Sequence, residues 1–173
     1  MKRYSNLPSR PLIITLEMEE EQQHRFNLLR TQFFPSHANY LDAHITLFYK
    51  LPSHQPGIQA ALEQFAQRPP LVLDVVQIKQ AGNWVAYHLQ SPALQALHLQ
   101  MQEAFAPWLC KQDSKPLHPH ITILNKTTEY KAKQVHQHLQ QNFEPFSIPT
   151  TGFKTWLYMK GPWKAQHVYA FRS

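Results

Sequence analysis

The chain alternates between two spacings of hydrophobic residues, one typical of strands and the other of helices. Strands are predicted at residues 11–18, 43–51, 71–80, 83–90, 120–125, 153–159 and 167–173. Helices are predicted at residues 19–34, 56–67, 92–108 and 127–141. Prolines, turn glycines and Ser or Thr caps separate these segments. Helices and strands mixed in this order predict an α+β protein.

The order of elements repeats, and so does one short phrase. After the first strand, each half of the chain runs through a long helix, a strand, a shorter helix and two strands joined by a turn. The phrase "LDAHITLFYK" (41–50) in the first half corresponds to "LHPHITILNK" (117–126) in the second. A duplicated unit is the simplest explanation, and it predicts two similar lobes related by a rough two-fold axis. No linker separates the halves, so we expect a single bilobal domain over residues 1–173.

The repeated phrase places polar groups on one face of each strand. Because side chains i and i+2 of a strand share a face, His44 points with Thr46, and His120 points with Thr122. The aliphatic residues between and after them point the other way, into apolar packing. The lysine that ends each phrase has the same parity as the threonine but lies near the strand end, where the chain can leave the sheet.

Two imidazoles that face each other across a groove suit phosphoryl transfer without a metal. A neutral imidazole takes a proton from the attacking water or hydroxyl, and a protonated one gives a proton to the departing oxygen. An unperturbed imidazole pKa of about 6.5 makes both forms available near neutral pH. The hydroxyls of Thr46 and Thr122 could donate hydrogen bonds to the phosphate oxygens. The alternative is a duplicated strand whose polar face is simply solvated.

The segments "HITL" at 44–47 and "HITI" at 120–123 resemble the two H-x-[ST]-φ motifs of the 2H phosphoesterase superfamily. The chain looks most like the branch described as 2′-5′ RNA ligase-like or RNA 2′,3′-cyclic phosphodiesterase. This resemblance implies a bilobal α+β fold with two antiparallel sheets, helices on the outside, and a central cleft that holds both motifs.

The same resemblance implies residue roles and a substrate class. It implies His44 and His120 as acid and base, and Thr46 and Thr122 as phosphate binders, with no metal or cofactor required. Many members carry an arginine shortly after the second motif, and Lys126 is the nearest basic residue here, so we expect a phosphate contact from it. The expected reaction opens a 2′,3′-cyclic phosphate, at an RNA end or on a nucleotide, to a 2′-phosphate.

Three other functions fit the same motifs. A 2′-5′ RNA ligase or 2′-5′ phosphodiesterase would use the same pair of imidazoles on a different linkage. A hydrolase of a cyclic phosphate on a non-RNA metabolite would differ only in its substrate. A non-catalytic module would bind RNA ends or phosphorylated ligands in the cleft without turnover.

Charge and cysteine content limit the environment and the ligand. The formal net charge is +6, and residues 111–173 hold nine Lys or Arg and three Asp or Glu, whereas residues 1–110 hold eight of each kind. Such a surface attracts polyanions, although it also suits a basic protein with no such ligand. Cys110 is the single cysteine, and the apolar run near the N-terminus is too short for a signal peptide or a membrane span. We therefore expect a cytoplasmic protein with no membrane contact, and we expect it to act as a monomer.

Other residues invite a functional interpretation with which a structural one competes. Four aromatic residues could stack on a nucleobase or could belong to the core or its rim: Tyr49, Trp156, Tyr158 and Trp163. Of these, Tyr158 is kept as a candidate substrate contact. His136 and His138 form an H-x-H pair, but on a helix two such residues point in different directions, so we expect no metal site. Cys110 follows an apolar run and is expected to be a buried small residue.

Overall fold

The structure is a computed structural model, and it describes residues 10–173. The basic start of the chain, residues 1–9, lies outside the described part. The strands are β1 (Pro11–Met18), β2 (Ile45–Pro52), β3 (Val72–Ala81), β4 (Trp84–Gln90), β5 (His120–Leu124), β6 (Phe146–Tyr158) and β7 (Trp163–Ala170). The α-helices are α1 (Glu20–Phe33), α2 (Pro56–Phe65), α3 (Pro92–Ala104) and α4 (Glu129–Gln140). Short 3₁₀ turns follow α1 at Ser36–Ala38 and α3 at Ala106–Trp108.

All strand pairs are antiparallel, and β6 links two sheets into one hydrogen-bonded path. The strand order is β2-β1-β6-β3-β4-β5, with β7 also paired to β6. The first part of β6, Phe146–Pro149, pairs with β3. Its later part, residues 150–157, pairs with β1, and β7 lies on its other edge. The long strand β6 therefore carries the chain from one sheet to the other.

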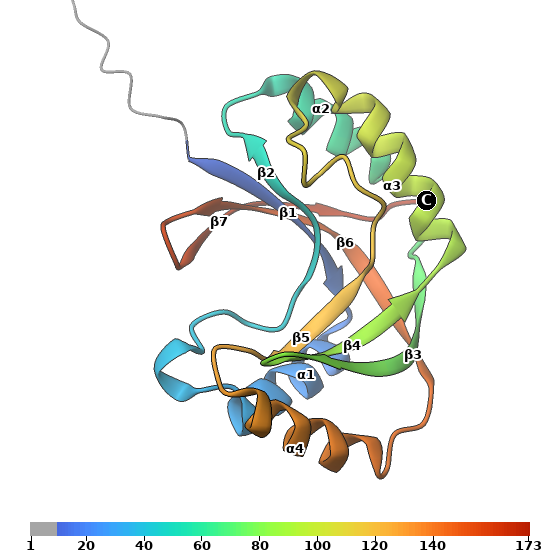
Figure 1. Cartoon of the computed structure of the whole chain (residues 1–173). Helices are drawn as coiled ribbons and strands as arrows, with labels where there is room; N and C mark the ends of the chain where they lie inside the picture. Colours follow the sequence, from blue (N-terminus) through green and yellow to red (C-terminus); the bar gives the residue numbers. More distant parts are fainter. Residues whose placement is uncertain (1–9) are drawn as a thin grey trace, which may run out of the picture.

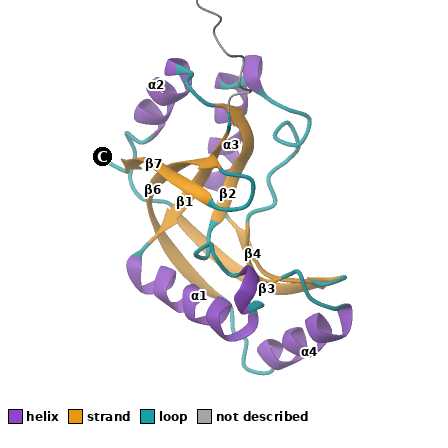
Figure 2. Ribbon diagram, turned by 90° about the vertical axis from the view of Figure 1, so that its left-hand side faces the viewer, coloured by secondary structure: helices purple, strands orange, loops and turns teal. Residues whose placement is uncertain are grey.

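Each sheet combines strands from both halves of the sequence. The hairpin β3–β4 belongs to the first repeat, yet β4 pairs with β5, which carries the second H-I-T phrase. The first H-I-T strand, β2, pairs with β1, which in turn pairs with β6 from the second repeat. Helices α2 and α3 lie on the outer side of the β2 sheet, and α1 and α4 on the outer side of the β5 sheet (Figure 1; Figure 2). The predicted α+β fold is confirmed, but each lobe is built from both repeats.

One buried hydrophobic cluster runs through both lobes. Phe48 of β2 packs edge-on against Phe105, the residue that follows α3, with ring centroids 5.3 Å apart. On the other side Phe26 of α1 packs edge-on against Tyr87 of β4, also at 5.3 Å. Both contacts lie behind the strands that carry the H-I-T phrases, so apolar packing holds each strand from its outer face.

The largest difference from the predicted elements is in β6. The sequence pattern predicts a strand at 153–159, whereas β6 begins seven residues earlier, at Phe146. Polar residues and Pro149 hide this part, and pairing with β3 stabilises it. Gly152 lies near the start of the part that pairs with β1, opposite Ala170 of β7, and its φ is 158°. A Cβ there would collide with the carbonyl oxygen of Tyr169 in β7, so only glycine fits this close approach.

Among the described residues, the helices are too short or too polar to cross a lipid bilayer.

Candidate active site

The two histidines of the repeated phrase are held in the same way. His44 Nδ1 lies 2.7 Å from the carbonyl oxygen of Asp42, and His120 Nδ1 lies 2.8 Å from that of His118. A carbonyl oxygen can only accept, so in both rings Nδ1 carries the hydrogen and donates it. Nε2 of each ring is then the atom that can accept a proton when the ring is neutral, or donate one when it is protonated.

Each H-I-T strand bulges at the residue after its threonine. Along β1 and β2, Thr15 pairs with Thr46 but Ile14 pairs with Phe48, which leaves Leu47 as the extra residue. Ile123 is the extra residue of β5 in the same way, because the pairing with β4 shifts by one residue after Thr122. The predicted alternation of faces therefore holds for the histidine and the threonine of each phrase. It does not extend to the lysines, because Lys50 lies beside a second irregularity of the ladder, between Phe48 and Leu51, and Lys126 lies beyond the end of β5.

A buried carboxylate holds the chain beyond the first bulge. Asp113 is 3 % exposed and accepts two backbone N–H bonds of 2.8 Å, from Tyr49 and Lys50. Burial raises the pKa of the Tyr49 hydroxyl, and a hydrogen bond with the Thr46 hydroxyl partly offsets this. The side chain of Tyr49 therefore lies beside Thr46. The sequence carries no local signal for Asp113, which stands in a polar loop 63 residues from Lys50.

The long helices hold the backbone at both motifs. Arg30 of α1 donates a 2.9 Å hydrogen bond to the carbonyl oxygen of Thr122, beside the second bulge. His98 of α3 lies with Nε2 3.0 Å from the carbonyl oxygen of Leu47, the residue of the first bulge. A bulge leaves backbone groups without a partner in the ladder, and these side chains supply one. Both side chains are almost completely buried, and the sequence pattern identified neither.

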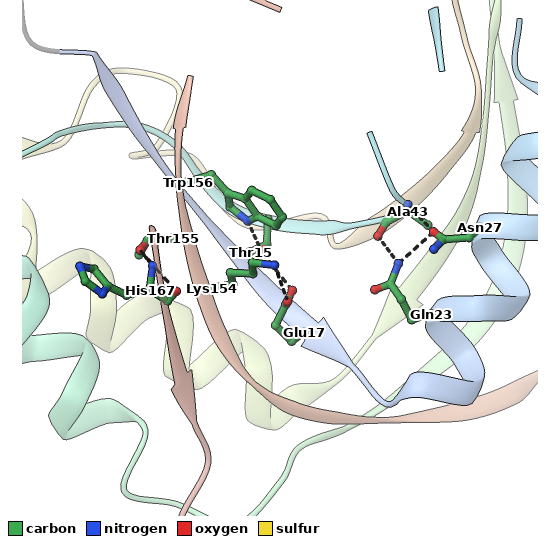
Figure 3. A network of polar contacts seen from close by, with 9 residues as sticks. All are labelled: Thr15, Glu17, Gln23, Asn27, Ala43, Lys154, Thr155, Trp156 and His167. Atoms are coloured by element: carbon green, nitrogen blue, oxygen red, sulfur yellow. Dashed lines mark hydrogen bonds and ion pairs between the residues drawn. The ribbon is translucent and has the colours of Figure 1, made fainter. Parts of the chain in front are cut away.

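Helix α1 also holds the segment that leads into His44. Gln23 donates a 2.8 Å hydrogen bond to the carbonyl oxygen of Ala43, and the amide of Ala43 donates one of 2.8 Å to the Asn27 side chain. Gln23 also donates to Asn27, which closes a three-residue network (Figure 3). The residue before the first histidine is thus fixed at both of its backbone polar groups.

The charge environment favours the neutral form of His44. Burial lowers its pKa to about 4, and the positive charges of Arg30 and His120 act in the same direction. The hydrogen bond to the Asp42 carbonyl and the Asp42 carboxylate oppose this change. Burial also lowers the pKa of Arg30, to about 10, so its guanidinium is still a cation at neutral pH. The expectation of an unperturbed imidazole is therefore wrong for His44.

Aromatic rings and a polar network border His44. The Trp163 ring lies 4.6 Å from the imidazole of His44, between centroids, and 6.1 Å from the ring of Trp156. Lys154 Nζ is 4.1 Å from the centroid of the Trp156 ring and 4.0 Å from a carboxylate oxygen of Glu17 (Figure 3). A cavity of about 280 Å³ lies between these side chains, and His44 forms part of its wall.

A tryptophan also contacts the second motif. Trp84 of β4 lies edge-on to His120, with centroids 5.4 Å apart. Its Nε1–H donates a 3.1 Å hydrogen bond to the hydroxyl of Thr122. That hydroxyl accepts from Trp84, so its own hydrogen is free to be donated elsewhere.

The remaining candidates lie at the edge of the site or outside it. Lys126 has a φ of 55° and donates a 3.3 Å hydrogen bond to the Tyr40 hydroxyl. Tyr158 pairs with Trp163 at the end of the last hairpin and is 39 % exposed. Cys110 is half-buried rather than fully buried, which corrects the expectation for it.

The H-x-H pair of His136 and His138 is engaged outside the site. His136 hydrogen-bonds the carbonyl oxygen of Ile78 through Nε2 at 3.0 Å, and His138 packs on Phe33 with centroids 5.8 Å apart. Within residues 10–173, no three His, Cys, Asp or Glu side chains gather as a set of metal ligands.

Comparison with known proteins places this arrangement in a family. The family model described as the 2′-5′ RNA ligase superfamily matches residues 18–161. A search of curated protein sequences finds no match. LigT of E. coli, crystallised with 3′-AMP, superposes with a TM-score of 0.61 at 21 % identity, over 95 % of this chain and 99 % of LigT. TT0787 of Thermus thermophilus superposes with a TM-score of 0.63 at 15 % identity, over 94 % and 98 % of the two chains. These structural likenesses show a common fold.

Proposed function

Because the chain belongs to the 2′-5′ RNA ligase superfamily of 2H phosphoesterases, we propose that it opens 2′,3′-cyclic phosphates to 2′-phosphates by acid–base catalysis. The substrate is an RNA end or a nucleotide that carries the cyclic phosphate, and His44 and His120 are the catalytic residues. The observation that carries this proposal is the matched pair of imidazoles, each held at Nδ1 by a backbone carbonyl and each with Nε2 available.

The two histidines have different roles in this reaction. Neutral His44 accepts a proton at Nε2 from the attacking water, which forms a bond to phosphorus. The bond between phosphorus and the 3′ oxygen breaks, and His120, as an imidazolium, gives its proton to that oxygen. The lowered pKa of His44 supports this assignment, because a base must be neutral at the working pH. The hydroxyls of Thr46 and Thr122 donate hydrogen bonds to the non-bridging oxygens as negative charge builds up.

The cavity beside His44 has the chemistry of a nucleoside subsite. Trp156 and Trp163 offer aromatic surface on which a base or ribose can pack, next to the imidazole that acts on the phosphate. The crystal structure of E. coli LigT with 3′-AMP supports a nucleotide ligand for this fold. Lys126 and Tyr158 are proposed as peripheral contacts, since each lies at a rim of the site. The chain is proposed to act as one bilobal domain and as a monomer.

The test is turnover of a 2′,3′-cyclic nucleotide and of an RNA with a cyclic end, in the presence of a chelator. His44→Ala and His120→Ala should each lower kcat/KM at least about 10²-fold while the protein stays folded. His24→Ala, on the exposed face of α1, is the matched control and should retain the wild-type rate. Folded His44→Ala and His120→Ala variants that turn over at the wild-type rate would refute the mechanism.

The position of the product phosphate separates this function from the alternatives. A 2′-phosphate from a cyclic end supports the proposal, whereas cleavage or joining of 2′-5′ dinucleotides alone supports the ligase or 2′-5′ phosphodiesterase alternative. Tight binding without turnover over a broad panel of cyclic phosphates and dinucleotides would indicate a binding module.

A further inference from the structure

The strands beside the two H-I-T strands present related positions. In one sheet, Thr15 pairs with Thr46 on one side and with Lys154 on the other. In the other sheet, Ala86 pairs with Thr122 on one side and with Lys79 on the other. Lys154 and Lys79 therefore occupy equivalent positions, two strands away from their threonines and on the same face as them.

Glu17 and His88 are equivalent in the same sense. His88 pairs directly with His120 across β4 and β5. Continuing the register of Thr15 with Thr46 and of Leu16 with Ile45 brings Glu17 opposite His44. Each motif histidine thus faces one side chain on the neighbouring strand, which is an acid in one sheet and an imidazole in the other.

Because one sheet has Glu17 where the other has His88, the two sheets differ in charge. Lys154 lies 4.0 Å from the Glu17 carboxylate, so the first sheet carries a neutralised pair. Lys79 is exposed on β3, and no carboxylate lies within ion-pair distance of it among the residues that the structure describes. Burial lowers the pKa of His88, and the charges around it that act in the same direction are all positive: Lys79, His118 and His120.

The register places the side chains of His88 and His120 against each other. Leu89 donates a 2.9 Å backbone hydrogen bond to Pro119, so the pair of His88 and His120 falls at the alternate, non-hydrogen-bonded position. Side chains of such pairs are the closest in an antiparallel sheet, with Cβ atoms about 4.5–5.5 Å apart. Ala86, with no bulky side chain, lies between Thr122 and Lys79 in the register. A run of basic side chains therefore extends from His120 through His88 towards Lys79.

We propose that Lys79, His88 and His118 form a second anion subsite, which binds the phosphodiester on the 5′ side of the terminal nucleotide. This inference rests on the proposed function and narrows its substrate to the end of an oligonucleotide. β3 lies two strand spacings from β5, about 9–10 Å, a span that one nucleotide and an extended lysine side chain can bridge. The equivalent site on the first sheet is occupied by the Lys154–Glu17 pair. The oligonucleotide therefore extends over β4 and β3 and not over β1 and β6.

The test compares three substrates that share the same reacting end. They are a 2′,3′-cyclic mononucleotide, a dinucleotide with that end, and the same dinucleotide with an uncharged methylphosphonate linkage. For the wild-type protein, kcat/KM should be about tenfold higher for the charged dinucleotide than for the other two substrates. Lys79→Ala should bring the ratio of charged to uncharged dinucleotide to about one. The matched control, Lys131→Ala on α4, removes one exposed lysine elsewhere and should leave that ratio high.

A wild-type protein that processes charged and uncharged dinucleotides alike would overturn the subsite and leave the cyclic phosphodiesterase intact. The subsite would also be overturned if Lys79→Ala and Lys131→Ala lowered the ratio of kcat/KM for charged over uncharged dinucleotide equally. If no substrate is opened, the proposed function fails, and the subsite is tested by the affinity for the two dinucleotide 2′-phosphates. Tighter binding of the dinucleotide with the charged linkage supports the subsite. The slope of log binding constant against log salt concentration should also be smaller in magnitude by about 0.7 in Lys79→Ala than in the wild-type protein. Equal affinity for both linkages refutes it.

Discussion

The protonation of His44 can be tested directly, without any assumption about the substrate. The structure lowers the pKa of this imidazole to about 4, first by burial and then by the positive charges of Arg30 and His120. An ordinary histidine has a pKa of about 6.5. At pH 5.5 a group with a pKa of about 4 is roughly 97 % neutral, whereas an ordinary imidazole is roughly 9 % neutral. The two cases therefore differ about tenfold in the amount of available base.

The same shift in pKa makes the folded protein less stable in acid. The pKa of His44 is lower in the folded state than in the unfolded chain, so folding is disfavoured once the unfolded chain binds the proton. This contribution to stability is complete above pH 6.5 and is lost as the pH falls towards 4. The difference between the two pKa values corresponds to about 3 kcal/mol. Unfolding by denaturant at pH 7 and pH 4.5 should show a smaller change in His44→Gln than in the wild-type protein.

The decisive measurement is an NMR titration of ring-labelled histidine. The resonance of His44 is assigned by its absence from the spectrum of His44→Gln, and its midpoint should lie near pH 4. Its ring nitrogen shifts should report hydrogen on Nδ1, because that atom donates to the Asp42 carbonyl. Arg30→Met should move the midpoint upwards, since it removes a nearby positive charge. A midpoint near 6.5, or hydrogen on Nε2, would refute the account of this site.

Two further predictions concern the residues that support the motifs. The carboxylate of Asp113 accepts hydrogen bonds from the backbone N–H groups of Tyr49 and Lys50. In Asp113→Asn the amide nitrogen would face one of these two donors, so the variant should be less stable by about 2–4 kcal/mol in denaturant unfolding. An unchanged free energy of unfolding would mean that the two hydrogen bonds to the Asp113 carboxylate do not contribute to stability. Trp84→Phe keeps an aromatic ring in place but removes the donor to the Thr122 hydroxyl, and kcat/KM should fall about three- to tenfold. A wild-type rate in that variant would show that the hydrogen bond does not orient the hydroxyl.

The parts of the site that depend on local periodicity were predictable. A strand of H-I-T followed by aliphatic residues presents its histidine and threonine on one face whatever surrounds it. The repetition of the phrase also predicted two related strands, and the family and fold implied by the resemblance are confirmed. Catalysis by His44 and His120 is still a prediction.

The parts that depend on distant contacts were not predictable. Arg30 reaches Thr122 over 92 residues, and His98 reaches Leu47 over 51. No periodic pattern marks such side chains, because each is defined by the backbone group that it meets. The bulges at Leu47 and Ile123 are hidden for a related reason, since they are visible only in the register with a partner strand. The sequence pattern also does not show that each sheet pairs strands of one repeat with strands of the other, because a pattern predicts the elements but not which of them pair.

The proposed mechanism gives two chemically identical groups different fixed roles, and such an assignment requires that their surroundings differ. The repeated residues cannot supply that difference, because both motifs have the same bulge and the same hydrogen bond at Nδ1. It comes from the surroundings of the motifs: burial, followed by the cation of Arg30, lowers the pKa of His44, and Glu17 stands at the position that His88 takes in the other sheet. Duplication therefore accounts for the matched geometry of the two motifs, while the unequal neighbours are the basis of the proposed direction of proton transfer and of the proposed second phosphate site. A variant that exchanges Glu17 and His88 should disturb both properties while leaving the two motifs unchanged.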